Sequence, residues 1–162
     1  MTKEELDKLF SYNKDTGELL WKVSKGSIKA GAVAGCTTNS KGYVQILINR
    51  KSYKAHRLIW VIMTGTEPVN QIDHIDHNRA NNKWNNLREV TRKENMLNLT
   101  KKSHNTSGFT GVTYIKRNNK WAATIFYQGK RYHLDYYDDK EDAIKSRMLA
   151  NIKYGFHPNH GE

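Results

Sequence analysis

The sequence has one cysteine, Cys36, and two prolines among its 162 residues. A single thiol excludes an intramolecular disulfide and a zinc site built from several cysteines, and we expect no disulfide-linked partner. The longest apolar run, residues 58–63, falls far short of the ~20 residues that a transmembrane helix needs. The N-terminus also lacks the basic start and apolar run of a signal peptide. We therefore expect a protein that is not secreted, is intracellular and has no membrane partner.

Acidic residues are few, because Asp and Glu number 16 against 27 Lys and Arg, which gives a formal net charge of +11. This surplus favours a polyanionic partner, since each neutralised phosphate releases a counterion. The alternative is a basic surface kept for solubility. Positions 99–137 hold seven basic residues and one acid, Asp135, and are the most positive segment. That placement favours a nucleic-acid-binding face in the second half of the chain.

Hydrophobic residues make up 37% of the chain and charged residues 27%, which is a folded composition with little core. Two compact modules fit this composition better than one large core. In the first module the patterns predict two helices and three strands. The helices span residues 2–9 and 56–64, and the strands span 18–22, 43–48 and 52–55.

One further segment of the first module is predicted to fold as strand, loop, strand and helix. The predicted strands, 71–74 and 87–90, flank an Asn-rich loop and precede a helix over residues 92–98. The helix begins with Thr91 as its cap and Glu94 at the third helical position, which completes a capping box.

The second module follows a polar segment, residues 99–107, that is typical of a linker. Beyond it the patterns predict three strands with hairpin turns at Asn118-Asn119 and Gln128-Gly129. These strands span 111–115, 121–127 and 130–136, and a helix from Asp139 or Lys140 to Tyr154 follows. The apolar face predicted for this helix contains Ala143, Ile144, Met148 and Ile152. The predicted fold class is α+β, with a small three-stranded antiparallel sheet packed on one helix in this module.

Three polar residues of the first module suggest phosphodiester chemistry. Asp73 and His74 end the first strand of residues 71–98, and Asn95 lies 22 residues after Asp73 in the predicted helix. A carboxylate and an amide oxygen are hard ligands suited to Mg²⁺. A neighbouring imidazole can take a proton from the water that attacks phosphorus, while a metal ion neutralises charge on the leaving oxygen.

The same segment resembles the ββα-metal motif of HNH endonucleases, in particular the phage and intron-encoded homing-type members. The resemblance covers about residues 5–98 and rests on spaced motifs: Ile72-Asp73-His74-Ile75-Asp76-His77-Asn78, Asn81-Asn82, Asn85-Asn86-Leu87-Arg88, Val90-Thr91, Glu94-Asn95 and the upstream Ala55-His56-Arg57. It implies one divalent ion per active site, Mg²⁺ or Mn²⁺.

The resemblance implies a role for each matching residue. Asp73 and Asn95 would hold the metal, His74 would be the general base, and Asn86 would brace the loop that presents His74. His56 would have an auxiliary role near the site. His77 departs from the family pattern, which has a small residue such as Gly there. It is a second auxiliary candidate, able to touch phosphate or simply to face water.

The second module resembles the AP2/ERF DNA-binding domain over about residues 107–155. The resemblance rests on Gly108-Phe109-Thr110-Gly111-Val112, Lys120-Trp121-Ala122-Ala123-Thr124-Ile125, Gly129-Lys130-Arg131-Tyr132-His133-Leu134 and Asp142-Ala143-Ile144. In that family the sheet lies in the major groove. The matching contact positions are Thr113, Ile115, Thr124, Phe126, Arg131 and His133. The flanking cations Lys116, Arg117, Lys120 and Lys130 are expected to grip phosphates.

These observations predict an HNH endonuclease domain over residues 1–98 with its core at 71–98, a linker at 99–107 and a DNA-binding domain at 108–157. The predicted activity is metal-dependent hydrolysis of double-stranded DNA, by nicking or double-strand cleavage, in a monomer or homodimer. The resemblance implies a phage homing-type enzyme, which would act in the host cytoplasm. The alternatives are a non-catalytic sequence-specific DNA-binding regulator and an RNA-binding protein that uses exposed tyrosines.

Overall fold

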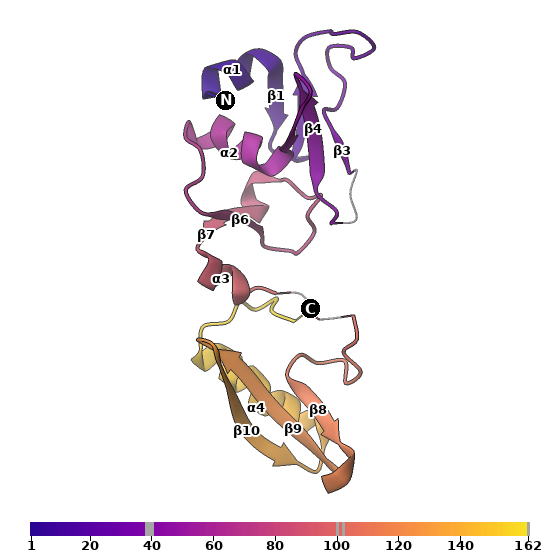
Figure 1. Ribbon diagram of the computed structural model, residues 1–162, viewed down its shortest axis with the longest axis vertical. Helices are drawn as coiled ribbons and strands as arrows, with labels where there is room; N and C mark the ends of the chain where they lie inside the picture. Colours follow the sequence, from indigo (N-terminus) through magenta and orange to yellow (C-terminus); the bar gives the residue numbers. More distant parts are fainter. Residues whose placement is uncertain (38–40, 100, 102, 162) are drawn as a thin grey trace. The chain divides into compact units, whose positions relative to one another are not determined.

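The computed structural model describes residues 1–37, 41–99, 101 and 103–161 (Figure 1). Its elements form several small antiparallel sheets with a few helices, which confirms the predicted α+β class. The chain divides into two compact units, Met1–Asn95 and Met96–Glu162. In the described part of the chain, no helix combines the length and apolar character needed to cross a membrane.

The described part of the first unit contains three small sheets and three α-helices (Figure 1). Its elements are α1 (Lys3–Leu9), β1 (Phe10–Asn13), β2 (Glu18–Trp21), β3 (Cys36–Thr37), β4 (Val44–Ile48), β5 (Lys51–Lys54), α2 (Ala55–Thr64), β6 (Gln71–His74), β7 (Leu87–Val90) and α3 (Arg92–Met96). The sheet pairs are β1–β2 and β6–β7, and the third sheet has the order β3–β4–β5. Strands β1 and β3 were not predicted. Helix α3 ends at Met96, before the predicted end at residue 98.

The core of the first unit lies under α1 and α2. Leu6 of α1 and Ile59 of α2 are fully buried, and Phe10 and Ile46 are almost so. Each such side chain contributes about 1.5–3 kcal/mol of hydrophobic stabilisation. Helix α2 ends where Gly65 takes a left-handed conformation and its N–H bonds the Val61 carbonyl. This packing anchors the segment that leads into β6.

The second unit is a three-stranded antiparallel sheet packed on one helix, as predicted. Its elements are β8 (Val112–Ile115), β9 (Lys120–Tyr127), β10 (Lys130–Tyr137) and α4 (Lys140–Lys153), in the sheet order β10–β9–β8. Gln128 and Gly129 both have positive φ, so the predicted two-residue turn joins β9 to β10. Leu99, in the segment predicted as a linker, hydrogen-bonds His160 and Gly161 of this unit, while Thr100 and Lys102 lie outside the described residues.

The predicted apolar face of α4 is wrong in part. Met148 and Ile152 are 52% and 78% exposed. The buried residues of the helix are Ala143, Arg147 and Ala150, which recur at helical spacing. The two alanines allow close packing on the sheet, and the whole Arg147 side chain, which is 2% exposed, is buried beside them with its guanidinium 5.2 Å from the Phe156 ring centre.

Candidate active site and nucleic-acid interface

The candidate residues gather around the β6–β7 pair. Asp73 lies opposite Arg88, and His74 lies opposite Leu87, so His74 is the last paired residue of β6. Adjacent side chains of a strand point to opposite faces. Asp73 and His74 therefore flank the end of β6 on its two sides.

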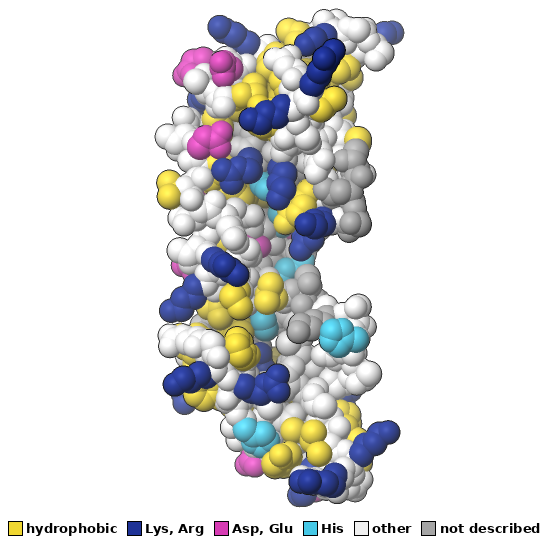
Figure 2. All heavy atoms as spheres, in the orientation of Figure 1, with side chains coloured by type: hydrophobic (Ala, Val, Ile, Leu, Met, Phe, Trp, Pro, Cys, Tyr) yellow, Lys and Arg dark blue, Asp and Glu magenta, His cyan; other side chains and the backbone are white. Residues whose placement is uncertain are grey.

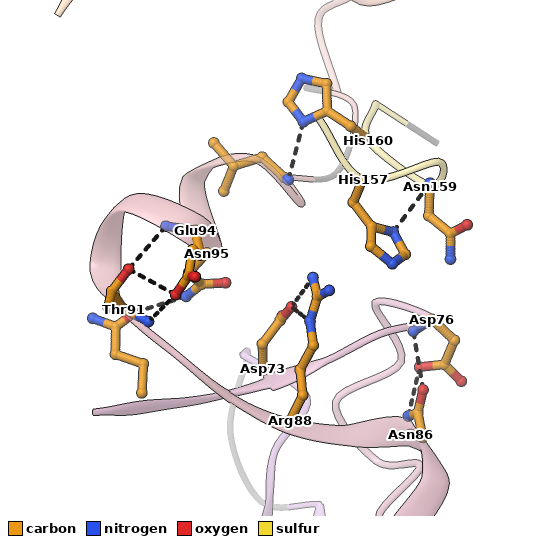
Figure 3. A network of polar contacts seen from close by, with 12 residues as sticks. Asp73, Asp76, Asn86, Arg88, Thr91, Glu94, Asn95, His157, Asn159 and His160 are labelled. Atoms are coloured by element: carbon orange, nitrogen blue, oxygen red, sulfur yellow. Dashed lines mark hydrogen bonds and ion pairs between the residues drawn. The ribbon is translucent and has the colours of Figure 1, made fainter. Parts of the chain in front are cut away.

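The carboxylate of Asp73 is nearly buried and is paired with Arg88 (Figure 3). Both Nε and Nη2 of Arg88 donate to Asp73 Oδ2, at 3.0 and 2.9 Å. The Asn95 Nδ2 atom donates to Gln71 Oε1 at 2.7 Å. Gln71 and Asp73 are two residues apart on β6 and share one face of the strand. The hydrogen bond to Gln71 therefore holds the Asn95 side chain at the face that presents Asp73.

The capping box predicted at Thr91 is confirmed, and it positions α3 beside β6. Thr91 Oγ1 accepts from the Glu94 N–H, while Glu94 Oε2 accepts from the Thr91 N–H and hydroxyl (Figure 3). These bonds satisfy backbone donors at the start of the helix. The helix start fixes the backbone of Asn95, whose N–H bonds the Thr91 carbonyl.

The ring of His74 is buried and is bonded through one nitrogen. His74 Nε2 lies 3.1 Å from Asn82 Oδ1, and Asn82 Nδ2 donates to the Ala80 carbonyl. That second bond orients the amide with its oxygen toward the imidazole. Nε2 therefore carries the proton in the neutral ring, and Nδ1 is the basic nitrogen.

Burial lowers the pKa of His74, although the bond to Asn82 and the charges of Asp76 and Asp73 act to raise it. The ring is consequently neutral at pH 7, which is the state that a general base requires.

His56 lies beside His74. The two imidazole rings are 5.1 Å apart and nearly perpendicular, and the Tyr43 ring is 5.2 Å from His56 and 6.0 Å from His74. His56 is 4% exposed, and its Nδ1 has no hydrogen-bond partner among the described residues. Burial lowers its pKa to about 3, with the neighbouring His74 as a further cause.

Acid is expected to destabilise the first unit partly through His56. The folded state keeps His56 neutral down to a pKa of about 3, whereas the unfolded chain titrates near 6.5. The unfolded state therefore binds more protons as the pH falls below 6.5, at a cost of up to about 1.4 kcal/mol per pH unit. His56→Phe should show a shallower loss of unfolding free energy with acid, measured by denaturant unfolding at several pH values. Identical pH dependence in the variant and the wild type would contradict this role, and His104→Phe is the exposed control.

Asn86 braces the loop between the two strands. Its Oδ1 accepts from the Asp76 N–H at 3.0 Å, and its Nδ2 donates to Asp76 Oδ1 at 2.8 Å (Figure 3). The same Nδ2 also donates to the Asn81 carbonyl at 2.8 Å. Burial acts to raise the pKa of Asp76, but the amide bonds from Asn81 and Asn86 hold it below its usual value. The contacts of Asn86 are with the loop, while the direct contact with His74 comes from Asn82.

His77 lies in the same loop in the left-handed region, with φ 62°. Its N–H bonds the His74 carbonyl at 3.0 Å and tightens the turn after β6. A left-handed backbone is favourable for glycine, which gives a physical reason for the small residue of the family pattern at this position.

The open face of the second sheet carries most of the predicted DNA contacts. Ala123 and Ile125 of β9 are buried beneath α4, so the alternating Thr124 and Phe126 face away from it. The cross-strand partners of these two residues are His133 and Arg131, respectively. By the same alternation, Thr113, Ile115 and Lys120 lie on this face.

Three of the predicted phosphate contacts lie elsewhere in the second unit. Lys130 pairs with Tyr127, and alternation places it on the helix side of the sheet. Lys116 and Arg117 lie in a short 3₁₀ turn before β9. Lys120, at one end of the open face, forms an ion pair with Asp138 at 2.9 Å. Dark-blue Lys and Arg side chains are spread over the surface seen in Figure 2 and are more widespread there than magenta carboxylates.

Sequence reasoning assigned no site role to Asn82, Arg88 or Tyr43. Asn82 and Arg88 do occur in the motif that carries the resemblance. Their positions in the motif were therefore a signal, but their residue types did not indicate a role in the site. Tyr43 gave no signal, because only the folding of β4 against α2 brings its ring to the histidines. Among the described residues, no three His, Cys, Asp or Glu side chains form a metal-binding group.

Comparison with known proteins agrees with this arrangement of strands and helix. Residues 53–97 match the HNH endonuclease family, and this segment contains β6, β7 and α3. Protein 3.8 of Escherichia phage T7 is 36% identical over 92 residues, which cover 52% of this chain and 76% of that protein. The chain therefore belongs to the HNH endonuclease family.

The chain is also similar to a solved structure that concerns DNA binding and cleavage by the HNH homing endonuclease I-HmuI. The identity is 27%, and the TM-score is 0.43, over 59% of this chain and 53% of that one. The chain thus spans about half the length of that solved chain.

Proposed function

We propose that this protein is a metal-dependent endonuclease that hydrolyses phosphodiester bonds in double-stranded DNA. The observation that carries the proposal is the arrangement of β6, which ends with Asp73 and the buried His74 and whose first residue, Gln71, holds Asn95 on the face that presents Asp73. The family supports a nuclease, and the net charge of +11 supports a nucleic-acid substrate. One such centre per chain cuts one strand, so a monomer nicks and two chains make a double-strand break.

The donor atoms at this site fit a divalent ion such as Mg²⁺ or Mn²⁺. Asp73 supplies a carboxylate, and the Asn95 amide, held through its nitrogen, supplies a carbonyl oxygen. Two hard oxygen ligands match the preference of Mg²⁺, which keeps several waters and takes phosphate oxygens from its substrate. When bound, the ion would supply charge neutralisation for the leaving 3′-oxygen.

His74 would act as the general base of the hydrolysis. Asn82 holds its Nε2–H, so Nδ1 is the atom that takes a proton from the attacking water. Asn86 and Asp76 hold the loop that carries Asn82, and the rings of His56 and Tyr43 restrict rotation of the imidazole. Arg88 pairs with Asp73 and fixes the direction of its carboxylate.

The second unit would bind duplex DNA through its open sheet face, in the manner of an AP2/ERF domain. Arg131, His133, Thr124 and the 52%-exposed Phe126 provide donors and an apolar contact on one surface. The RNA alternative needs free aromatic platforms. The Tyr127 and Tyr132 rings pack at 4.8 and 5.9 Å from Tyr154, just after α4, whereas Phe126 and Tyr136 are 52% and 44% exposed, so a binding comparison decides this alternative.

Replacing Arg131 with alanine is expected to weaken duplex binding and to relax base preference. A bidentate contact from arginine to guanine discriminates between bases by about 1–3 kcal/mol. Binding of a set of duplexes that differ at single positions measures the effect, with Lys145→Ala on α4 as the matched control. Unchanged affinity and cleavage-site choice in Arg131→Ala would rule out this contact.

The choice between the nuclease and its alternatives can be made with one set of substrates. The full chain is incubated with supercoiled plasmid, phage genomic DNA and a structured RNA in Mg²⁺. The proposal predicts cleavage of duplex DNA and intact RNA. Bound but uncut DNA would indicate the non-catalytic regulator, and tighter binding to RNA at several salt concentrations would indicate the RNA-binding protein. The phage relative supports action inside an infected host cell, in keeping with a homing-type enzyme.

A further inference from the structure

Two cations converge on one aromatic ring next to the buried histidines. The Lys54 Nζ atom lies 4.4 Å from the centre of the Tyr43 ring, and the Arg79 Cζ atom lies 5.0 Å from it. The same ring is 6.0 Å from the His74 ring. Lys54 ends β5 and Arg79 belongs to the loop between β6 and β7, so the fold brings separate elements together here.

Neither cation is neutralised by an acid in the described part of the chain. Both side chains are exposed, and no ion pair forms at either one. The carboxylate of Asp76, in the same loop as Arg79, is held by Asn81 and Asn86 instead. Arg79 Nη1 donates to the Lys41 carbonyl at 3.0 Å, which fixes the guanidinium beside the ring.

We propose that Lys54 and Arg79, held by the Tyr43 ring, form a phosphate ledge that binds the DNA backbone next to the phosphodiester being cut. The proposal deepens the proposed function and rests on it for the identity of the polyanion. Two cations held close together without an acidic partner repel each other, and binding of an anion relieves this repulsion. Cation–π contact keeps both side chains ordered, so less conformational entropy is lost when the phosphates bind.

The ledge would act in binding rather than in the chemical step. It contacts phosphates that stay unreacted, so its interactions are equal in the ground state and the transition state. Losing one cation should therefore raise KM and leave kcat nearly unchanged. Tyr43 has two roles, since its ring also packs near His74, and its removal would change both constants.

The test measures duplex binding by the full chain against salt concentration, in EDTA so that no cleavage occurs. Arg79→Gln and Lys54→Gln should each flatten the plot of log affinity against log salt by about 0.9, and the double variant by about twice that. Arg79→Lys should retain most of the slope, and Tyr43→Phe, which keeps the ring, should match the wild type. Lys8→Gln, an equal charge change on α1, is the control.

The outcomes separate the ledge from the proposed nuclease. Slopes in Arg79→Gln and Lys54→Gln equal to the wild-type slope would overturn the ledge, even if the wild type cleaves DNA. Flattening by Lys8→Gln as large as that by Arg79→Gln would overturn it too, because net charge would then explain the effect. Flattened slopes confined to the ledge variants would support it, even if the wild type failed to cut DNA in Mg²⁺.

Discussion

His74→Ala is expected to lower the rate of DNA cleavage by about 10²–10⁴-fold, the usual contribution of a general base. The neutral imidazole, with its Nε2–H committed to Asn82, has Nδ1 available to take a proton from water. Alanine leaves no group at this position that could do so. Duplex affinity should stay within a few-fold of the wild type, because the base contributes little to ground-state binding.

Single-turnover cleavage and equilibrium binding, run on the same duplex, would measure both quantities for His74→Ala. His104→Ala removes an exposed imidazole from the other unit and is the matched control. Cleavage by His74→Ala at the wild-type rate would remove His74 from the mechanism. A fall in affinity equal to the fall in rate would instead assign it to binding.

The second large effect is expected for Asp73→Asn, which should lose divalent-ion binding and, with it, DNA cleavage. The substitution keeps the shape of the side chain but removes the negative charge that a cation requires. It also leaves the Arg88 guanidinium with a neutral acceptor, which should cost about 1–3 kcal/mol of unfolding free energy.

Calorimetric titration with Mn²⁺ measures ion binding independently of cleavage, and denaturant unfolding measures the stability cost. The control is Glu89→Gln, which removes one negative charge from the partner strand β7. Glu89 is not a proposed ligand, because its carboxylate accepts from the Asn70 N–H instead. Retained Mn²⁺ affinity in Asp73→Asn would contradict the assignment of Asp73 as a ligand. An equal loss of Mn²⁺ affinity in Glu89→Gln would show that the effect comes from the change in net charge and not from a lost ligand.

Much of the fold was predictable from short sequence motifs, because the interactions that form them involve residues close together in the chain. The Thr91–Glu94 capping box and the Gln128-Gly129 turn depend on a few neighbouring residues, and both occur where predicted. The α4 face shows where periodicity fails. Met148 fits the apolar pattern but is exposed, because close helix–sheet contact selects the small Ala143, and the whole Arg147 side chain is buried beside it.

The candidate site was predictable as a set of residues but not as a set of contacts. The resemblance identified Asp73, His74 and Asn95; the structure has Asp73 and His74 at the end of β6 and Asn95 bonded to Gln71 at its start. The bond from Asn82 to His74 depends on the path of a loop with a left-handed residue, which no short-range pattern specifies. The position of Tyr43 depends on contacts between distant elements, which periodicity cannot give.

The most direct test of the central claim is reversible metal control of DNA cleavage by the wild-type chain. Supercoiled DNA to which the protein demonstrably binds is incubated with Mg²⁺, then with excess EDTA, then with Mg²⁺ restored. A metal-dependent endonuclease should produce relaxed or linear DNA in the first step, stop in the second and resume in the third. Cleavage that continues in EDTA, or bound DNA that stays supercoiled throughout, would contradict the account.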